Sequence, residues 1–117
     1  MALTIYHNPR CSKSRQTLAL LEAGGQTPTI RLYLDTPLSH HELTGLLEQL
    51  GYDDPRKLMR TGEAIYKELG LKTQTDKDAL MAAMLAHPKL IERPIVTDGR
   101  RAVLGRPPEN VQTFLSP

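Results

Sequence analysis

The stretch "LTIYHNPRCSKSRQTLALLEAGGQTPTIRLYL", residues 3–34, carries the clearest structural signal of the chain. Leu3–Tyr6 is a short apolar run typical of a buried strand, and helical spacing follows over Cys11–Ala23 until Gly24–Gly25 ends it. Thr29–Leu34 is strand-like. The apolar residues Ile30, Leu32 and Leu34 alternate there with Thr29, Arg31 and Tyr33. Together these segments predict a βαβ unit with parallel strands and a right-handed crossover.

The middle of the chain, about residues 38–90, is expected to be a helical insertion. Ser39 and Glu42 form a capping box for its first helix, and Thr75 with Asp78 is expected to cap its fourth. Apolar spacing and stop signals predict four helices, over Ser39–Gly51, Asp54–Met59, Glu63–Leu69 and Thr75–His87.

The last part of the chain completes the fold. After Pro94, "IVTDGRRAVL" predicts two short strands around a turn at Asp98–Gly99, and Pro107–Pro108 opens a final helix. The order is therefore βαβ, a helical insertion, then ββα, which is the order of a thioredoxin-like fold. We expect an α/β, thioredoxin-like single domain over residues 1–117, with a mixed four-stranded sheet.

Bulk composition argues against several classes of protein. A formal net charge of +2, with one Phe, four Tyr and no Trp, does not favour a nucleic-acid-binding surface. No segment approaches the roughly 20 apolar residues of a membrane span, and no signal-peptide pattern is evident, so we expect a cytoplasmic protein without membrane contact. One cysteine with scattered histidines supplies neither an internal disulfide nor a metal site. We expect a monomer.

Cys11, the only cysteine, lies where the first predicted strand passes into the first helix. Ligands of open α/β sheets bind at this edge, and a helix N-terminus lowers the pKa of a thiol. Arg10, Lys13 and Arg15 are expected to act in the same direction, and Ser14 offers a hydroxyl donor. The alternative is a buried structural cysteine, but the polar neighbours favour a reactive thiolate.

Two familiar thiol motifs are absent from this loop. Ser14 occupies the position that the second cysteine of a C-x-x-C motif would take. A tyrosine-phosphatase loop needs C-x5-R, but Thr17 stands there, and Arg15 follows Cys11 with C-x3-R spacing. Cys11 must therefore obtain its second thiol from another molecule or react with something other than a disulfide.

The loop "HNPRCSKSR" resembles the hallmark H-N-P-x-C-x-x-S-R of the arsenate reductases that work with glutathione and glutaredoxin. The residues that match it are His7, Asn8, Pro9, Cys11, Ser14 and Arg15. The likeness continues through "PTIRLYLDTP", "LMRTGEAIYKELGL", "AHPKLIERPIV" and "LGRPPENV", and so covers essentially the whole chain. It is strongest to a shorter subgroup of this family that lacks a C-terminal tail.

The resemblance implies a mechanism. The Cys11 thiolate would attack arsenate held by three arginines, Arg60, Arg93 and Arg106, and glutathione as co-substrate would attack the adduct before glutaredoxin completes the reduction to arsenite. No tightly bound cofactor and no metal are implied. The residues expected to support the site are His7, Asn8, Ser14, Arg15 and Pro94. Pro94 would be the cis-proline that faces the active site in thioredoxin folds.

Two other functions stay open at this stage. A monothiol, glutaredoxin-type oxidoreductase would use Cys11 and glutathione without needing Arg60 or Arg106, and Arg60 would then be an exposed helix-end cation that pairs with Glu63. An Spx-like regulator that binds RNA polymerase would share the fold, but such proteins typically carry a C-x-x-C switch that "CSKS" lacks.

Overall fold

A mixed sheet forms the centre of the protein in the computed structural model, which describes residues 2–115. Its strands are β1 (Thr4–Tyr6), β2 (Thr29–Arg31), β3 (Ile95–Thr97) and β4 (Ala102–Leu104), in the order β2-β1-β3-β4. β1 pairs parallel with β2 and antiparallel with β3, and β3 pairs antiparallel with β4. The expected βαβ unit, hairpin and four-stranded mixed sheet are confirmed.

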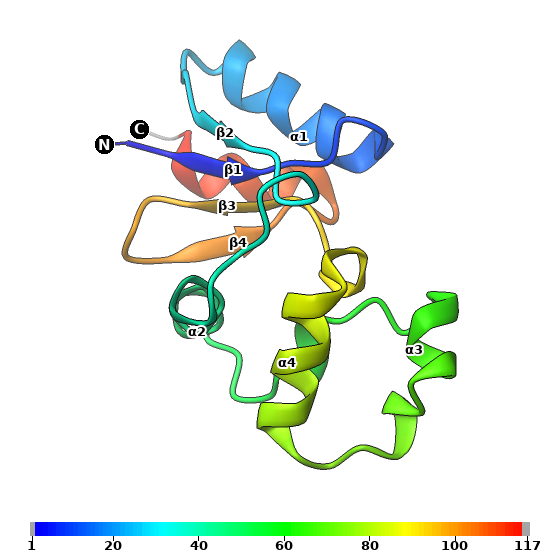
Figure 1. Cartoon of the computed structure of the whole chain (residues 1–117). Coiled ribbons are helices and arrows are strands. Elements are labelled where there is room, and N and C mark those ends of the chain that lie inside the picture. Colours follow the sequence, from blue (N-terminus) through cyan, green and yellow to red (C-terminus); the bar gives the residue numbers. More distant parts are fainter. Residues whose placement is uncertain (1, 116–117) are drawn as a thin grey trace.

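Helices cover both faces of this sheet (Figure 1). The α-helices are α1 (Ser12–Ala23), α2 (His40–Leu50), α3 (Ala64–Glu68) and α4 (Lys77–Ala86). The 3-10 helices are η1 (Pro55–Leu58), η2 (Leu71–Thr73), η3 (Pro88–Leu90) and η4 (Pro108–Phe114), so the final helix is a 3-10 helix. Within residues 2–115 we find no helix long and apolar enough to cross a lipid bilayer.

Two apolar clusters hold these layers together, because successive side chains of a strand point to opposite faces. Ile5 and Val96 pack with α1 and η4 on one face, together with Leu21, Val111 and Phe114. Ile95 and Ala102 face the other cluster, which the leucines and methionines of the insertion fill. The insertion extends away from the sheet, and α3 lies far from it (Figure 1).

The helix caps show which local sequence signals predicted the ends of the helices correctly. The Ser39 hydroxyl accepts from the Glu42 N–H at 3.0 Å, the Glu42 carboxylate accepts from the Ser39 N–H, and Gly51 ends α2 with a φ of 75°. The cap expected at Thr75 is wrong by one residue. Asp76 caps α4, because its carboxylate accepts the N–H of Asp78 at 3.0 Å.

The second strand is shorter than its alternating pattern predicts. It ends at Arg31, whose guanidinium bonds to the carbonyls of Thr36 and Pro37 and to Glu42 and thereby bends the chain. Tyr33 consequently turns inward and is 1% exposed. The alternating leucines and isoleucine remain on the surface of an edge strand and its turn: Ile30, Leu32 and Leu34.

Gly105 brings α1 and the segment before β3 close together. Its N–H donates to the Pro94 carbonyl at 2.9 Å, and its own carbonyl accepts from the Thr17 hydroxyl at 3.3 Å. A Cβ on Gly105 would meet Pro94 Cγ at 2.7 Å and would overlap the Thr17 side chain. The Arg93–Pro94 bond is cis, as expected, and so is the Arg106–Pro107 bond. Only glycine permits this approach.

We therefore expect Gly105→Ala to lower the free energy of unfolding by about 1–3 kcal/mol, the usual cost of overpacking a dense site. Gly62→Ala is the matched control, because a Cβ there meets nothing within 4 Å. Urea denaturation followed by circular dichroism measures both variants. An unchanged urea midpoint for Gly105→Ala would show that α1 and the Pro94 segment can move apart without loss of stability.

Candidate active site

Cys11 occupies the N-cap of α1, with φ −94° and ψ 122°, and is partly exposed. Its N–H donates to the Asn8 carbonyl and its carbonyl accepts the Arg15 N–H, each at 3.0 Å. The Asn8 side chain accepts the Arg10 N–H at 3.0 Å. The loop therefore makes a tight turn that points the thiol at the start of the helix, where backbone N–H groups are unpaired.

The motif residues around the cysteine hold this turn in place. His7 Nδ1 and Ser14 Oγ lie 2.6 Å apart, and Ser14 Oγ also accepts the Asn8 N–H at 3.1 Å. All three residues are buried. Arg15 donates to the Pro9 carbonyl at 2.9 Å. The Ser14 hydroxyl, which the sequence offered as a donor to a thiolate or an oxyanion, thus makes hydrogen bonds within the loop.

His7 is buried beside a cationic side chain. Burial lowers the pKa of His7, and the positive charge of Arg15 lowers it further. The imidazole is therefore neutral at physiological pH, where it acts on the loop through Ser14 and adds no positive charge near the thiol.

Two of the predicted arginines reach the thiol. Arg106 Nη1 lies 3.9 Å from Cys11 Sγ and 3.4 Å from the Arg93 carbonyl oxygen. Burial raises the pKa of Cys11, but the Ser14 N–H, the Arg93 guanidinium and the Lys13 N–H together outweigh it, and the pKa is lowered overall. Arg93 thus lowers the pKa of the thiol and Arg106 lies beside it, where we had expected Arg10, Lys13 and Arg15 to act.

Arg60, the third predicted arginine, is linked to Arg106 through the carboxylate of Glu92. The Arg60 N–H donates to the Leu90 carbonyl at 2.7 Å and the Glu92 N–H to the Leu58 carbonyl at 2.8 Å, around a bridge between Met59 and Ile91. Arg60 Nη1 consequently lies 2.9 Å from Glu92 Oε1, and Arg60 also pairs with Glu63 at 3.2 Å. The pairing with Glu63 that we considered as an alternative is therefore present together with the cluster.

Glu92 connects the arginines, and sequence reasoning missed it. Its second carboxylate oxygen, Oε2, lies 4.0 Å from Arg106 Nε. Contacts thus run from Arg60 through Glu92 and Arg106 to Cys11. The only sequence signal was its position directly before Arg93 in "ERPI".

Tyr33 is a second residue that sequence reasoning missed. Burial raises its pKa to about 12, while the charges of Arg93, Cys11, Arg60 and Glu92 also act on the hydroxyl. Within residues 2–115 the Tyr33 hydroxyl and Arg93 Nε are buried without a hydrogen-bond partner. Two buried donors in this region therefore have free hydrogen-bonding capacity.

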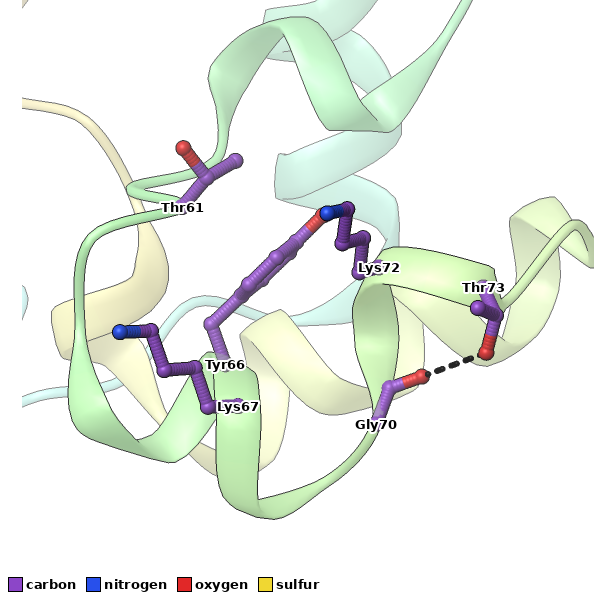
Figure 2. Close-up of a pocket in the computed structure, with 6 residues that line it drawn as sticks. All are labelled: Thr61, Tyr66, Lys67, Gly70, Lys72 and Thr73. Carbon is purple, nitrogen blue, oxygen red and sulfur yellow. Dashed lines mark hydrogen bonds between the residues drawn. The ribbon is translucent and has the colours of Figure 1, made fainter.

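Cavities show where a small ligand would fit. One of about 360 Å³ is lined by Arg60, Glu92 and Arg106, with Met59, Thr61, Gly62 and Glu63. Another of about 620 Å³ lies beside α3, and Figure 2 shows its lining of Thr61, Tyr66, Lys67, Gly70, Lys72 and Thr73. The second cavity is lined by no arginine. The first is lined by two of the predicted arginines, and Arg106 connects it to the Cys11 thiol, so it is the candidate site. In the described part of the chain, no three His, Cys, Asp or Glu side chains are grouped to hold a metal ion.

Fold and site together define a thioredoxin-fold protein with one activated thiol beside clustered arginines. The chain belongs to the ArsC family, whose characteristic sequence pattern it matches over residues 6–114. This is the family that the cysteine loop resembles.

Individual relatives align over nearly their full length. The chain is 50% identical to the arsenate reductase of Haemophilus influenzae, over 98% of this chain and 100% of that protein. It is 46% identical to the arsenate reductase of Neisseria meningitidis, over 97% of each chain. Among solved structures, the arsenate reductase of Vibrio cholerae superposes with a TM-score of 0.93 at 55% identity, covering 98% of both chains.

We expect Cys11 to react with iodoacetamide at neutral pH faster than a free cysteine, because its lowered pKa leaves more thiolate. Arg93→Gln removes a group that lowers this pKa, so the midpoint of the rate-against-pH curve should move upward and the rate at pH 7 should fall several-fold. Arg100→Gln, in the exposed β3–β4 turn, is the control and should leave the curve in place. If the curves for Arg93→Gln and the unaltered protein coincide, Arg93 does not lower the pKa of Cys11.

Proposed function

We propose that this protein is an arsenate reductase in which Cys11 is the nucleophile and Arg60, Arg93 and Arg106 bind the oxyanion. The observation that carries the proposal is the approach of Arg106 Nη1 to within 3.9 Å of Cys11 Sγ, together with the lowered pKa of that thiol. The names of relatives at 46–55% identity support arsenate as the substrate.

Electrostatics explain why the site needs arginines. A thiolate and arsenate are both anions, so their encounter is unfavourable unless positive charge screens it. Arg106 lies at the thiol and Arg93 presents a buried Nε without a partner among the described residues. Guanidinium groups suit paired oxygens, and donors already in place stabilise charge that develops during attack.

The supporting residues prepare the nucleophile. His7, Asn8, Ser14 and Arg15 hold the loop, and the backbone N–H groups of Lys13 and Ser14 favour the thiolate. Pro94, buried and cis, packs at Gly105 beside the helix. Their proposed role is to keep Cys11 Sγ at the helix N-terminus, where it can attack arsenic.

The remaining steps need thiols from outside the chain, since Cys11 is its only cysteine. Glutathione attacks the arsenic–cysteine adduct, and glutathione and glutaredoxin supply the electrons that release arsenite. Such a cycle requires the reducing conditions of a cytoplasm. We propose that the enzyme is a monomer with a single domain.

A monothiol oxidoreductase of glutaredoxin type is the second candidate, because Arg60 is already paired with two carboxylates, Glu63 and Glu92. Such an enzyme would reduce glutathione mixed disulfides at Cys11 and would not depend on Arg60 or Arg106.

A coupled assay separates the two candidates. We expect arsenate-dependent NADPH consumption with glutathione, glutaredoxin and glutathione reductase, abolished in Cys11→Ser and reduced about 100-fold in kcat/KM in Arg106→Ala, as when one oxyanion donor is removed. Arg100→Ala is the matched arginine control and should retain full turnover.

The same variants, together with Arg60→Ala, are also assayed with a glutathione mixed disulfide as the substrate. Turnover of that substrate without any arsenate-dependent rate, and with Arg60→Ala and Arg106→Ala fully active, would replace the reductase with the oxidoreductase.

A further inference from the structure

A carboxylate, that of Glu92, lies between two of the arginines proposed to bind the oxyanion. Glu92 lines the 360 Å³ cavity with Arg60 and Arg106, and its side chain is only 25% exposed. A negative charge at this place weakens the binding of any fully ionised anion, because like charges repel strongly where solvent is partly excluded. Its presence therefore constrains which oxyanions the site can accept.

The two oxygens of Glu92 have different surroundings. Oε1 accepts a hydrogen bond from Arg60 Nη1 at 2.9 Å. Oε2 has the looser contact, 4.0 Å to Arg106 Nε, and within residues 2–115 no donor makes a hydrogen bond to it. Because Arg106 also reaches to 3.9 Å from Cys11 Sγ, Oε2 lies on the side of the carboxylate that leads to the thiol.

A hydroxyl group on the ligand would change the repulsion into attraction. An O–H donor to a carboxylate makes a short, charge-assisted hydrogen bond. Arsenate and phosphate carry at least one hydroxyl at neutral pH, whereas sulfate carries none. Resting on the proposed function, we infer that Glu92 makes this site selective for protonated oxyanions: its Oε2 accepts the hydroxyl of hydrogen arsenate and excludes sulfate.

Glu63 is a second carboxylate partner of Arg60. It pairs with Arg60 Nε at 3.2 Å, is 26% exposed and lines the same cavity, yet its only ion pair among the described residues is with Arg60. The two glutamates thus carry the same charge at similar exposure, but only Glu92 reaches Arg106. They form a natural pair for comparison.

Protection of Cys11 against iodoacetamide measures anion binding without requiring turnover. Arsenate, phosphate and sulfate are each titrated at pH 7 and constant ionic strength. In the unaltered protein we expect arsenate and phosphate to protect far better than sulfate. In Glu92→Gln, which keeps size and removes charge, we expect the affinity for sulfate relative to phosphate to rise about tenfold.

Glu63→Gln should change the sulfate-to-phosphate ratio by less than about twofold, because a remaining charge at Glu92 still repels sulfate. Glu92→Asp keeps the charge and should keep sulfate excluded; circular dichroism confirms the fold of each variant. An unchanged ratio in Glu92→Gln, an equal loss of all three anions, or an equal shift in Glu63→Gln would each overturn the inference. If arsenate fails to protect the unaltered protein, the oxyanion site itself is refuted, and the proposed function with it.

Discussion

Positive charge gathered beside a single thiol is the condition on which the rest of the site depends. Guanidinium groups repel one another, and in a partly buried region this repulsion is costly unless an anion lies among them. Glu92 is that anion for Arg60 and Arg106, while Arg93 and the N-terminal N–H groups of α1 act on the Cys11 thiol. The same positive charge would also attract the oxyanion of the proposed reaction.

The topology of the sheet explains how distant segments meet at one point. Because β3 runs antiparallel to β1, Tyr6 at the end of β1 pairs with Ile95 at the start of β3, and Ile95 pairs in turn with Leu104 at the end of β4. The loop after β1 carries Cys11, while Arg93 precedes β3 and Arg106 follows β4. The thiol and two arginines thus meet at the same end of β1, β3 and β4. Gly105 lets α1 and the Pro94 segment approach closely there.

The helical insertion also contributes to this edge. Its return to the sheet is secured by the bridge between Met59 and Ile91, which aligns Arg60 with Glu92. A thioredoxin fold without this insertion would have the thiol and the cis-proline but no side chain in the place of Arg60. The insertion therefore has a chemical role in the proposed oxyanion site as well as a structural one.

Sequence alone determined the features that depend on near neighbours: the thiol at a helix start, the capping box at Ser39, the hairpin at Asp98–Gly99 and the order of elements. Resemblance to a family pointed to the three arginines. Only the tertiary structure decided that Tyr33 is buried in place of its apolar neighbours, that Arg93 and Arg106 act at the thiol and that Glu92 lies among the arginines. Burial and charge pairing depend on residues distant in sequence, which local periodicity does not encode.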